Sequence, residues 1–170
     1  MPACPPETHA HPSPVDQPLS ITYDHEAREM ERYRGLALSF LPSHPHVSRL
    51  MAALGIECEQ RLAALETLAE RLERRSCLPA PLARRRDHAT QYRQHLFIRD
   101  DATAAQTLSY ALAFAQHSLQ FSELMARHCQ LAGLDTLLTR FADGKRRECR
   151  LLEELRDQSP VTARATGSFG

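Results

Sequence analysis

The sequence lacks several features that would point to a particular class of protein. It contains no tryptophan and only six glycines, and no apolar run reaches the about 18 residues that a membrane-spanning helix needs. Its 21 basic residues equal its 21 acidic residues, so net charge does not indicate binding to nucleic acid or to a membrane surface. The amino-terminal residues have neither a basic start nor an apolar core, so we expect no signal peptide.

Cysteine usage also excludes familiar sites. The five cysteines are scattered along the chain and form no Cys-x-x-Cys pair. An odd number without such pairs is typical of reduced thiols rather than of a disulfide framework or a zinc site. We therefore expect a cytoplasmic protein with free cysteines.

What is present favours helices. Alanine, leucine, glutamate and arginine are abundant, and 170 residues suffice for one domain with a real core. Apolar residues recur at alternating spacings of four and three, and no segment alternates with a period of two over a useful length. The pattern predicts helices over residues 21–40, 46–75, 102–130 and 134–155.

The connections between these helices predict how they are arranged. A single domain is predicted over residues 18–157. We expect disordered tails on both sides of it, residues 1–17, which are rich in proline and histidine, and residues 158–170. The first and last connections are short, whereas the middle one covers residues 76–102. Short connections join antiparallel neighbours, and a long one can run the length of a bundle. The fold class predicted is all-α: a four-helix bundle of two antiparallel hairpins joined by a long crossover.

A carboxylate lies on the buried face of the first predicted helix. Glu26, Met30 and Tyr33 share that face, because residues four and three apart stack together on a helix. An isolated charge is too costly to bury, so a carboxylate at such a position is paired, protonated or bound to a metal. Glu26 is thus a metal ligand or a member of an ion-pair cluster.

Three short pieces of the sequence resemble the ferritin-like superfamily, nearest to rubrerythrin and bacterioferritin. Glu26 followed by Tyr33 is similar to the spacing between an iron ligand and a nearby tyrosine in the first helix of that family. Residues 57–65 and 147–155 resemble its Glu-x-x-His motif followed by a leucine-rich run. The resemblance implies a ferritin-like four-helix bundle with a di-iron site formed by carboxylates of all four helices and two histidines.

The chain departs from this pattern at both histidine positions. When the leucine-rich run sets the register, the motif of the second helix falls on Cys58 and Arg61. In the last helix Lys145 stands where the glutamate belongs, and Glu148 stands where the histidine belongs. We therefore expect a buried ionic cluster of Glu26, Arg61, Lys145 and Glu148, in which Lys145 and Glu148 pair directly. The protein would then be a rubrerythrin-related homodimer without bound metal, whose degenerate di-iron site leaves a structural or interaction role.

A second interpretation retains a metal. A weak internal repeat pairs Glu26 with His117 and Glu57 with Glu148, which gives three carboxylates and one imidazole. Such a set suits a single iron, manganese or zinc ion, and the resemblance implies iron. The protein would then be a metal-binding, oxidoreductase-like or iron-handling member. The sequence alone leaves open whether the chain is an enzyme.

Overall fold

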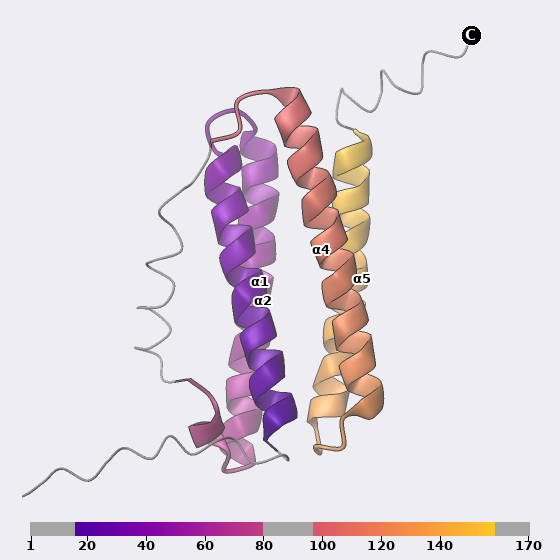
Figure 1. Cartoon of the computed structure of the whole chain (residues 1–170). Coiled ribbons are helices and arrows are strands. Elements are labelled where there is room, and N and C mark those ends of the chain that lie inside the picture. The colour runs from indigo at the N-terminus through magenta and orange to yellow at the C-terminus, as the bar shows by residue number, and fades with distance from the viewer. Residues whose placement is uncertain (1–15, 80–96, 159–170) are drawn as a thin grey trace, which may run out of the picture.

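The computed structural model of the chain describes residues 16–79 and 97–158, and these residues form a bundle of four long helices (Figure 1). The elements are α1 (Gln17–Phe40), α2 (Pro45–Arg71), a short 3₁₀ helix η1 (Arg75–Cys77), α4 (Asp101–His128) and α5 (Leu134–Asp157). No strand occurs in the two described ranges. The prediction of an all-α four-helix bundle is confirmed. None of these helices is long and apolar enough to cross a membrane.

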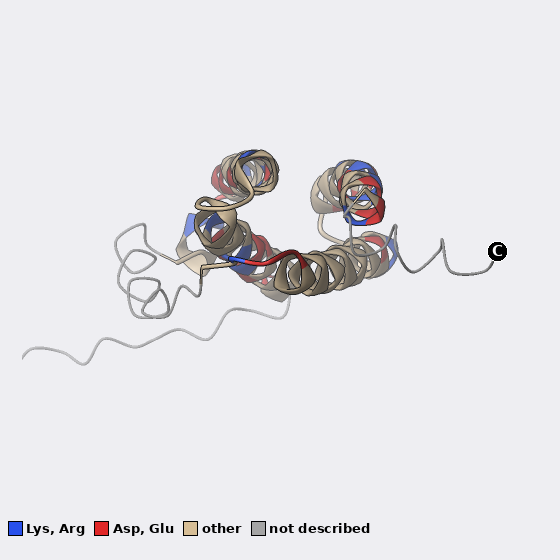
Figure 2. Cartoon of the chain, turned by 90° about the horizontal axis from the view of Figure 1, so that it is seen from above, with Lys and Arg blue, Asp and Glu red and all other residues tan. Residues whose placement is uncertain are grey.

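The helices form two antiparallel pairs. α1 packs along α2, and α4 packs along α5, while α2 meets α5 and α1 meets α4 between the pairs (Figure 1). Figure 2 shows the same four helices end-on, with acidic and basic residues distributed over the helices of both pairs. The network described below lies in the space enclosed by all four.

The two ends of the middle connection lie at opposite ends of the bundle. η1 follows the end of α2, whereas Ile98 donates its backbone N–H to the carbonyl of Ser39, near the end of α1, at 3.0 Å. α4 then begins at that same end of the bundle (Figure 1). Residues 80–96 lie outside the described part of the chain, so most of the predicted connection 76–102 does too.

α1 begins at Gln17, four residues before the predicted start, and its first turn contains Pro18. Asp16, directly before the helix, forms an ion pair with Arg74 at 2.7 Å, which ties the start of α1 to the segment after α2. Asp16 and Gln17 were predicted to belong to the tail and belong to the bundle instead. Residues 1–15 and 159–170 of the predicted tails lie outside the described residues.

α2 and α4 also differ from their predicted bounds for local reasons. α2 ends at Arg71 rather than at residue 75, because Glu73 adopts a left-handed conformation with φ of 57° that a helix cannot continue through. α4 begins at Asp101, where the side chain of Asp100 accepts a hydrogen bond from the backbone N–H of Thr103 at 2.8 Å. α5 begins at Leu134 as predicted and continues to Asp157.

The apolar faces predicted from the spacing form the core. Met51, Leu54, Leu62 and Leu65 of α2 are buried, and so are the matching positions of α1 and α5. Leu124 of α4 lies away from the core, since its side chain is 52% exposed. The buried face of α4 passes through Ser118 and Ser122 instead.

Candidate functional site: a buried ionic network

Glu26 lies at the centre of the bundle with 0% of its surface exposed. The guanidinium of Arg61, from α2, donates through Nε to Glu26 Oε2 at 2.7 Å. The ammonium of Lys145, from α5, lies 2.8 Å from Glu26 Oε1. Each carboxylate oxygen of Glu26 therefore faces its own cation, and each cation comes from a different helix.

Lys145 links the carboxylate to α4. Its ammonium, also 0% exposed, donates to Ser118 Oγ at 2.7 Å. Ser118 Oγ in turn lies 2.7 Å from His25 Nε2. An ammonium can only donate, so Ser118 Oγ accepts from Lys145, and the Ser118 hydroxyl shares a second hydrogen bond with His25 Nε2. The tautomer of His25 decides which of these two groups donates.

Glu148 is held by two other groups. The hydroxyl of Tyr33, from α1, donates to Glu148 Oε1. The Arg61 NH2 group lies 3.5 Å from Glu148 Oε2 and 3.0 Å from the Sγ of Cys58. Arg61 thus bridges the two buried carboxylates. The direct pair between Lys145 and Glu148 expected from the sequence does not form among the described residues, because Lys145 turns toward Glu26 instead.

The network contains two carboxylates and two cations, and the opposite charges shift the pKa values of Glu26 and Arg61 in favour of their ionised forms. Burial alone would raise the pKa of Glu26, but the Lys145 ammonium and the Arg61 guanidinium outweigh it and hold this pKa below its usual value. Burial would lower the pKa of Arg61, but the carboxylate of Glu26 raises it above its usual value. Burial and the adjacent Glu148 carboxylate both raise the pKa of Tyr33. Tyr33 therefore stays protonated and acts as a donor.

The neighbouring groups are held in their neutral forms. Burial, and then the positive charge of Lys145, lower the pKa of His25 to about 4. Burial raises the pKa of Cys58 to about 12, so its thiol stays protonated beside Arg61. The network is thus a fixed set of two cations and two anions surrounded by neutral donors and acceptors.

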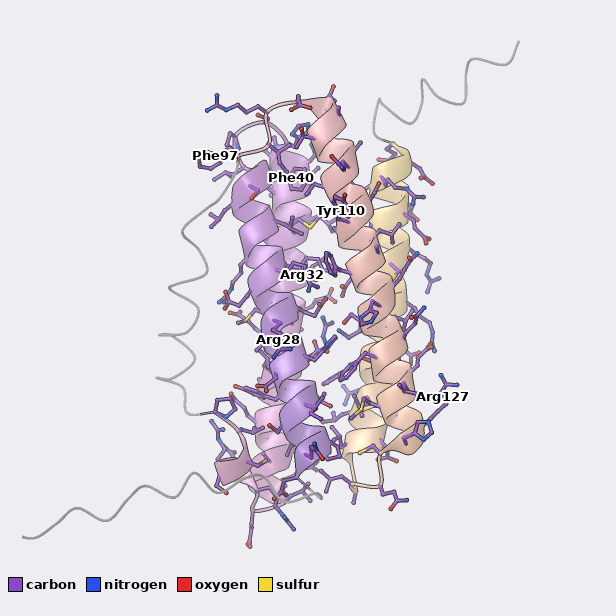
Figure 3. All side chains as sticks on the ribbon, in the orientation of Figure 1. Arg28, Arg32, Phe40, Phe97, Tyr110 and Arg127 are labelled. Carbon is purple, nitrogen blue, oxygen red and sulfur yellow. The ribbon has the colours of Figure 1, made fainter. Side chains whose placement is uncertain are left out.

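A second buried carboxylate lies beside the network. Glu29 is 3% exposed, and burial raises its pKa above the usual value. Arg32 donates to Glu29 Oε1, and its guanidinium stacks over the ring of Phe114 at 4.0 Å from the centroid. Figure 3 shows Arg32 in the space between α1 and α4. Sequence reasoning missed Glu29, although its spacing of three from Glu26 places both on neighbouring parts of one helix face.

The structure brings together the residues of the expected ionic cluster and does not bring together the alternative metal set. Glu26 and Glu148 are buried, whereas His117 is exposed and the side chain of Glu57 is 49% exposed. No group of three or more His, Cys, Asp or Glu residues in the described part of the chain is placed to hold a metal ion.

The groups around Glu26 do not fit an iron ion. The positions next to its two oxygens are taken by an ammonium and a guanidinium, and neither has a lone pair with which to ligate a metal. An iron ion there would also face two fixed positive charges. We therefore derive no chemistry through a metal at this site.

Ser118 superficially resembles an activated nucleophile, since a histidine and a lysine both contact it. Its hydroxyl is 0% exposed, and no substrate reaches a group enclosed by four helices. Lys145 already donates to Ser118, so it acts as a cation there and not as a base. Neither Ser118 nor His25 was selected from the sequence as part of a site. The only signal was their position: His25 directly precedes Glu26, and Ser118 lies about one helical turn after the buried Ala115 of α4.

No protein-family model, no curated protein and no solved structure matches this chain. The function is therefore inferred from the network and from the surface around it.

Proposed function

We propose that this chain is a ferritin-like protein related to rubrerythrin, in which an ionic network stands in place of the di-iron site. The protein then acts through its surface, as a structural or interaction partner, and not by metal-dependent redox chemistry. The observation that carries this proposal is the position of Arg61 and Lys145, at 2.7 and 2.8 Å from the two oxygens of Glu26.

The physical basis is charge compensation. A di-iron site places several positive charges among buried carboxylates, and those carboxylates cannot remain ionised without them. Here one guanidinium and one ammonium supply fixed positive charge to Glu26 and Glu148. Buried pairs of this kind add little net stability, whereas removal of one partner is strongly destabilising.

The arrangement of the helices supports the same proposal. α1 and α2 form one antiparallel pair and α4 and α5 form another (Figure 1). The connection between the pairs leaves α2 at one end of the bundle and returns near Ser39 at the other. We propose that it is the long crossover of the ferritin-like topology.

Iron titration of the purified protein tests this function. Anaerobic addition of Fe(II) to the wild-type chain is expected to show no saturable binding, and later admission of oxygen no accelerated oxidation. The variant Arg61→His with Lys145→Glu is the matched control, because it exchanges the two cations for an imidazole and a carboxylate around Glu26. This variant is expected to bind Co(II) or Fe(II). Saturable binding of two iron ions by the wild-type chain contradicts the proposal.

A row of large apolar side chains on α4 supports the interaction role. Tyr110, Phe114 and Leu124 are 59%, 48% and 52% exposed, whereas Phe121 is half-buried and stacks on His25. This set, here called the aromatic row, has spacings of four, seven and three residues, which keep its members along one side of the helix. Figure 3 shows Tyr110 on the same face of the molecule as Arg32 of α1.

We assign to the aromatic row the contact of a homodimer, in which α4 of each copy packs antiparallel along the other. Exposed aromatic side chains with an adjacent arginine are typical of the centre of an interface. Light scattering after size-exclusion chromatography is expected to give a dimer that Phe114→Ser together with Tyr110→Ser converts to a monomer. Ile56→Ser removes an equally exposed apolar residue (54%) from α2 and is expected to leave the dimer intact. A wild-type monomer would contradict the assignment.

A further inference from the structure

A groove between α2 and α5 lies directly outside the ionic network. It has a volume of about 370 Å³, and Arg61 forms part of its wall together with Arg140 and Arg147. The aromatic row and Arg32 belong to α4 and α1, so this groove is a separate feature. It shares Arg61 with the ionic network and otherwise lies outside it.

The guanidinium groups converge on one point of the groove. A Cβ atom placed on Gly144 would lie 3.8 Å from Arg147 NH2 and 3.9 Å from Arg61 NH1. Both groups therefore face the small open space that the missing side chain of Gly144 leaves. Arg140 lies one helical turn before Gly144 and lines the same wall.

The positive charge in the groove exceeds the negative charge. Glu57 is the carboxylate that lines it, with Oε2 3.8 Å from Arg61 NH1. Arg61 is already shared between Glu26 and Glu148 inside the bundle. Within residues 16–79 and 97–158, no carboxylate pairs with Arg140 or Arg147. The guanidinium groups of Arg140 and Arg147, which have no such partner there, favour an oxyanion, which a guanidinium binds through paired hydrogen bonds.

The rest of the groove is partly apolar. Leu137, Phe141 and Ala64 line it beside the arginines, together with the amide side chain of Gln60. An anion without carbon, such as phosphate, would satisfy the guanidinium groups but would leave these apolar side chains in contact with water. A carboxylate with a short aliphatic body satisfies both parts of the groove.

We propose that this groove binds a small aliphatic monocarboxylate, with the carboxylate between Arg147 and Arg61 over Gly144 and the aliphatic body against Phe141 and Leu137. Arg140 contributes positive charge at the mouth. Glu57 weakens binding, because its carboxylate competes for Arg61 and repels the ligand. The proposal needs no metal and no chemical step.

Isothermal titration calorimetry of the full chain tests it with hexanoate as the probe. Hexanoate is expected to bind saturably, with a dissociation constant in the millimolar range or below, and more tightly than acetate or inorganic phosphate. Hexylamine, with the same body and the opposite charge, is expected not to bind. Absence of saturable binding of hexanoate overturns the proposal, and phosphate binding more tightly than hexanoate overturns the choice of a carboxylate with an apolar body.

Variants of the lining residues test whether hexanoate binds in this groove. Arg147→Gln is expected to weaken hexanoate binding roughly tenfold or more, because it removes a charge-assisted hydrogen bond. Gly144→Leu is expected to abolish binding without changing any charge, since its side chain fills the space between the guanidinium groups. Glu57→Gln is expected to strengthen binding. Arg150→Gln, which removes an exposed arginine outside the groove on the same helix, is the matched control and is expected to bind as the wild type does.

Each variant is checked for folding by circular dichroism before titration. If Gly144→Leu does not fold, the opposite effects of Arg147→Gln and Glu57→Gln still test the site, since a general loss of stability would not make one variant bind more tightly. Equal affinities of these two variants and the wild type overturn the placement of the carboxylate between Arg147 and Arg61.

Discussion

Replacing Lys145 with methionine removes one of the four charges of the network and keeps a side chain of similar length. The wild-type network contains Glu26, Glu148, Arg61 and Lys145, so its charges cancel. Lys145→Met leaves two carboxylates with one cation in a region that water does not reach. Ser118 also loses its donor, so a buried hydroxyl oxygen is left without that partner.

The expected loss is large compared with the stability of a small domain. Removing one partner of a buried ion pair costs roughly 3–5 kcal/mol, and domains are stable by only about 5–15 kcal/mol. In a chain of this size that loss lowers the midpoint of thermal unfolding by roughly 6–20 °C. Adding Glu26→Gln to Lys145→Met restores the charge balance, so the double variant is expected to regain most of the lost stability.

Urea unfolding followed by circular dichroism measures these differences. The four proteins of the cycle are the wild type, Lys145→Met, Glu26→Gln and the double variant, and their coupling energy is the quantity of interest. Arg150→Met serves as the control, because Arg150 is exposed and its replacement is expected to change stability by less than about 0.5 kcal/mol. A loss below about 1 kcal/mol for Lys145→Met, or a double variant less stable than either single variant, would refute the reasoning.

The two buried carboxylates of α1 are expected to respond differently to neutralisation. Glu29→Gln is expected to leave the urea midpoint unchanged or slightly raised, because burial already raises the pKa of Glu29, whereas Glu26→Gln is expected to lower it clearly. Burial and the charge of Lys145 lower the pKa of His25 from 6.5 to about 4. The unfolded chain therefore takes up this proton at a higher pH than the folded chain does. As the pH drops from 6.5 toward 4, the free energy of unfolding is expected to fall by at most about 3 kcal/mol. An NMR titration that places this pKa at 6 or above contradicts the expectation. Tyr33→Phe removes a hydrogen bond to a buried carboxylate and is expected to cost about 1.5–3 kcal/mol in the same unfolding assay, while a neutral result would place the hydroxyl outside the network.

Much of this arrangement could be predicted from spacing alone. The four residues of the network each have apolar residues three or four positions away, so their burial agrees with the helical period. They are Glu26, Arg61, Lys145 and Glu148. Glu57 stands one residue before the buried Cys58, and a step of one residue along a helix rotates the side-chain direction by about 100°. Glu57 is exposed for that reason, although its sequence context resembles a metal motif.

The contacts between helices could not be predicted in the same way. These contacts depend on how far each helix is shifted and rotated relative to the others. This placement decides which cation contacts Glu26, and it brings Ser118 between Lys145 and His25. The helix ends depend on such contacts too. The ion pair between Asp16 and Arg74 joins residues that are far apart in the sequence, so the local sequence around either residue does not predict it.

Lys145 is the only lysine in the chain, all other basic residues being arginine. Its ammonium is fully buried, so the folded protein presents no lysine amine at all to solution. Amine-reactive labels, and enzymes that acylate or conjugate lysine, therefore have no lysine side chain of this sequence to modify until the bundle opens. The rate at which an amine-reactive mass label appears on Lys145 therefore measures how often the four helices open.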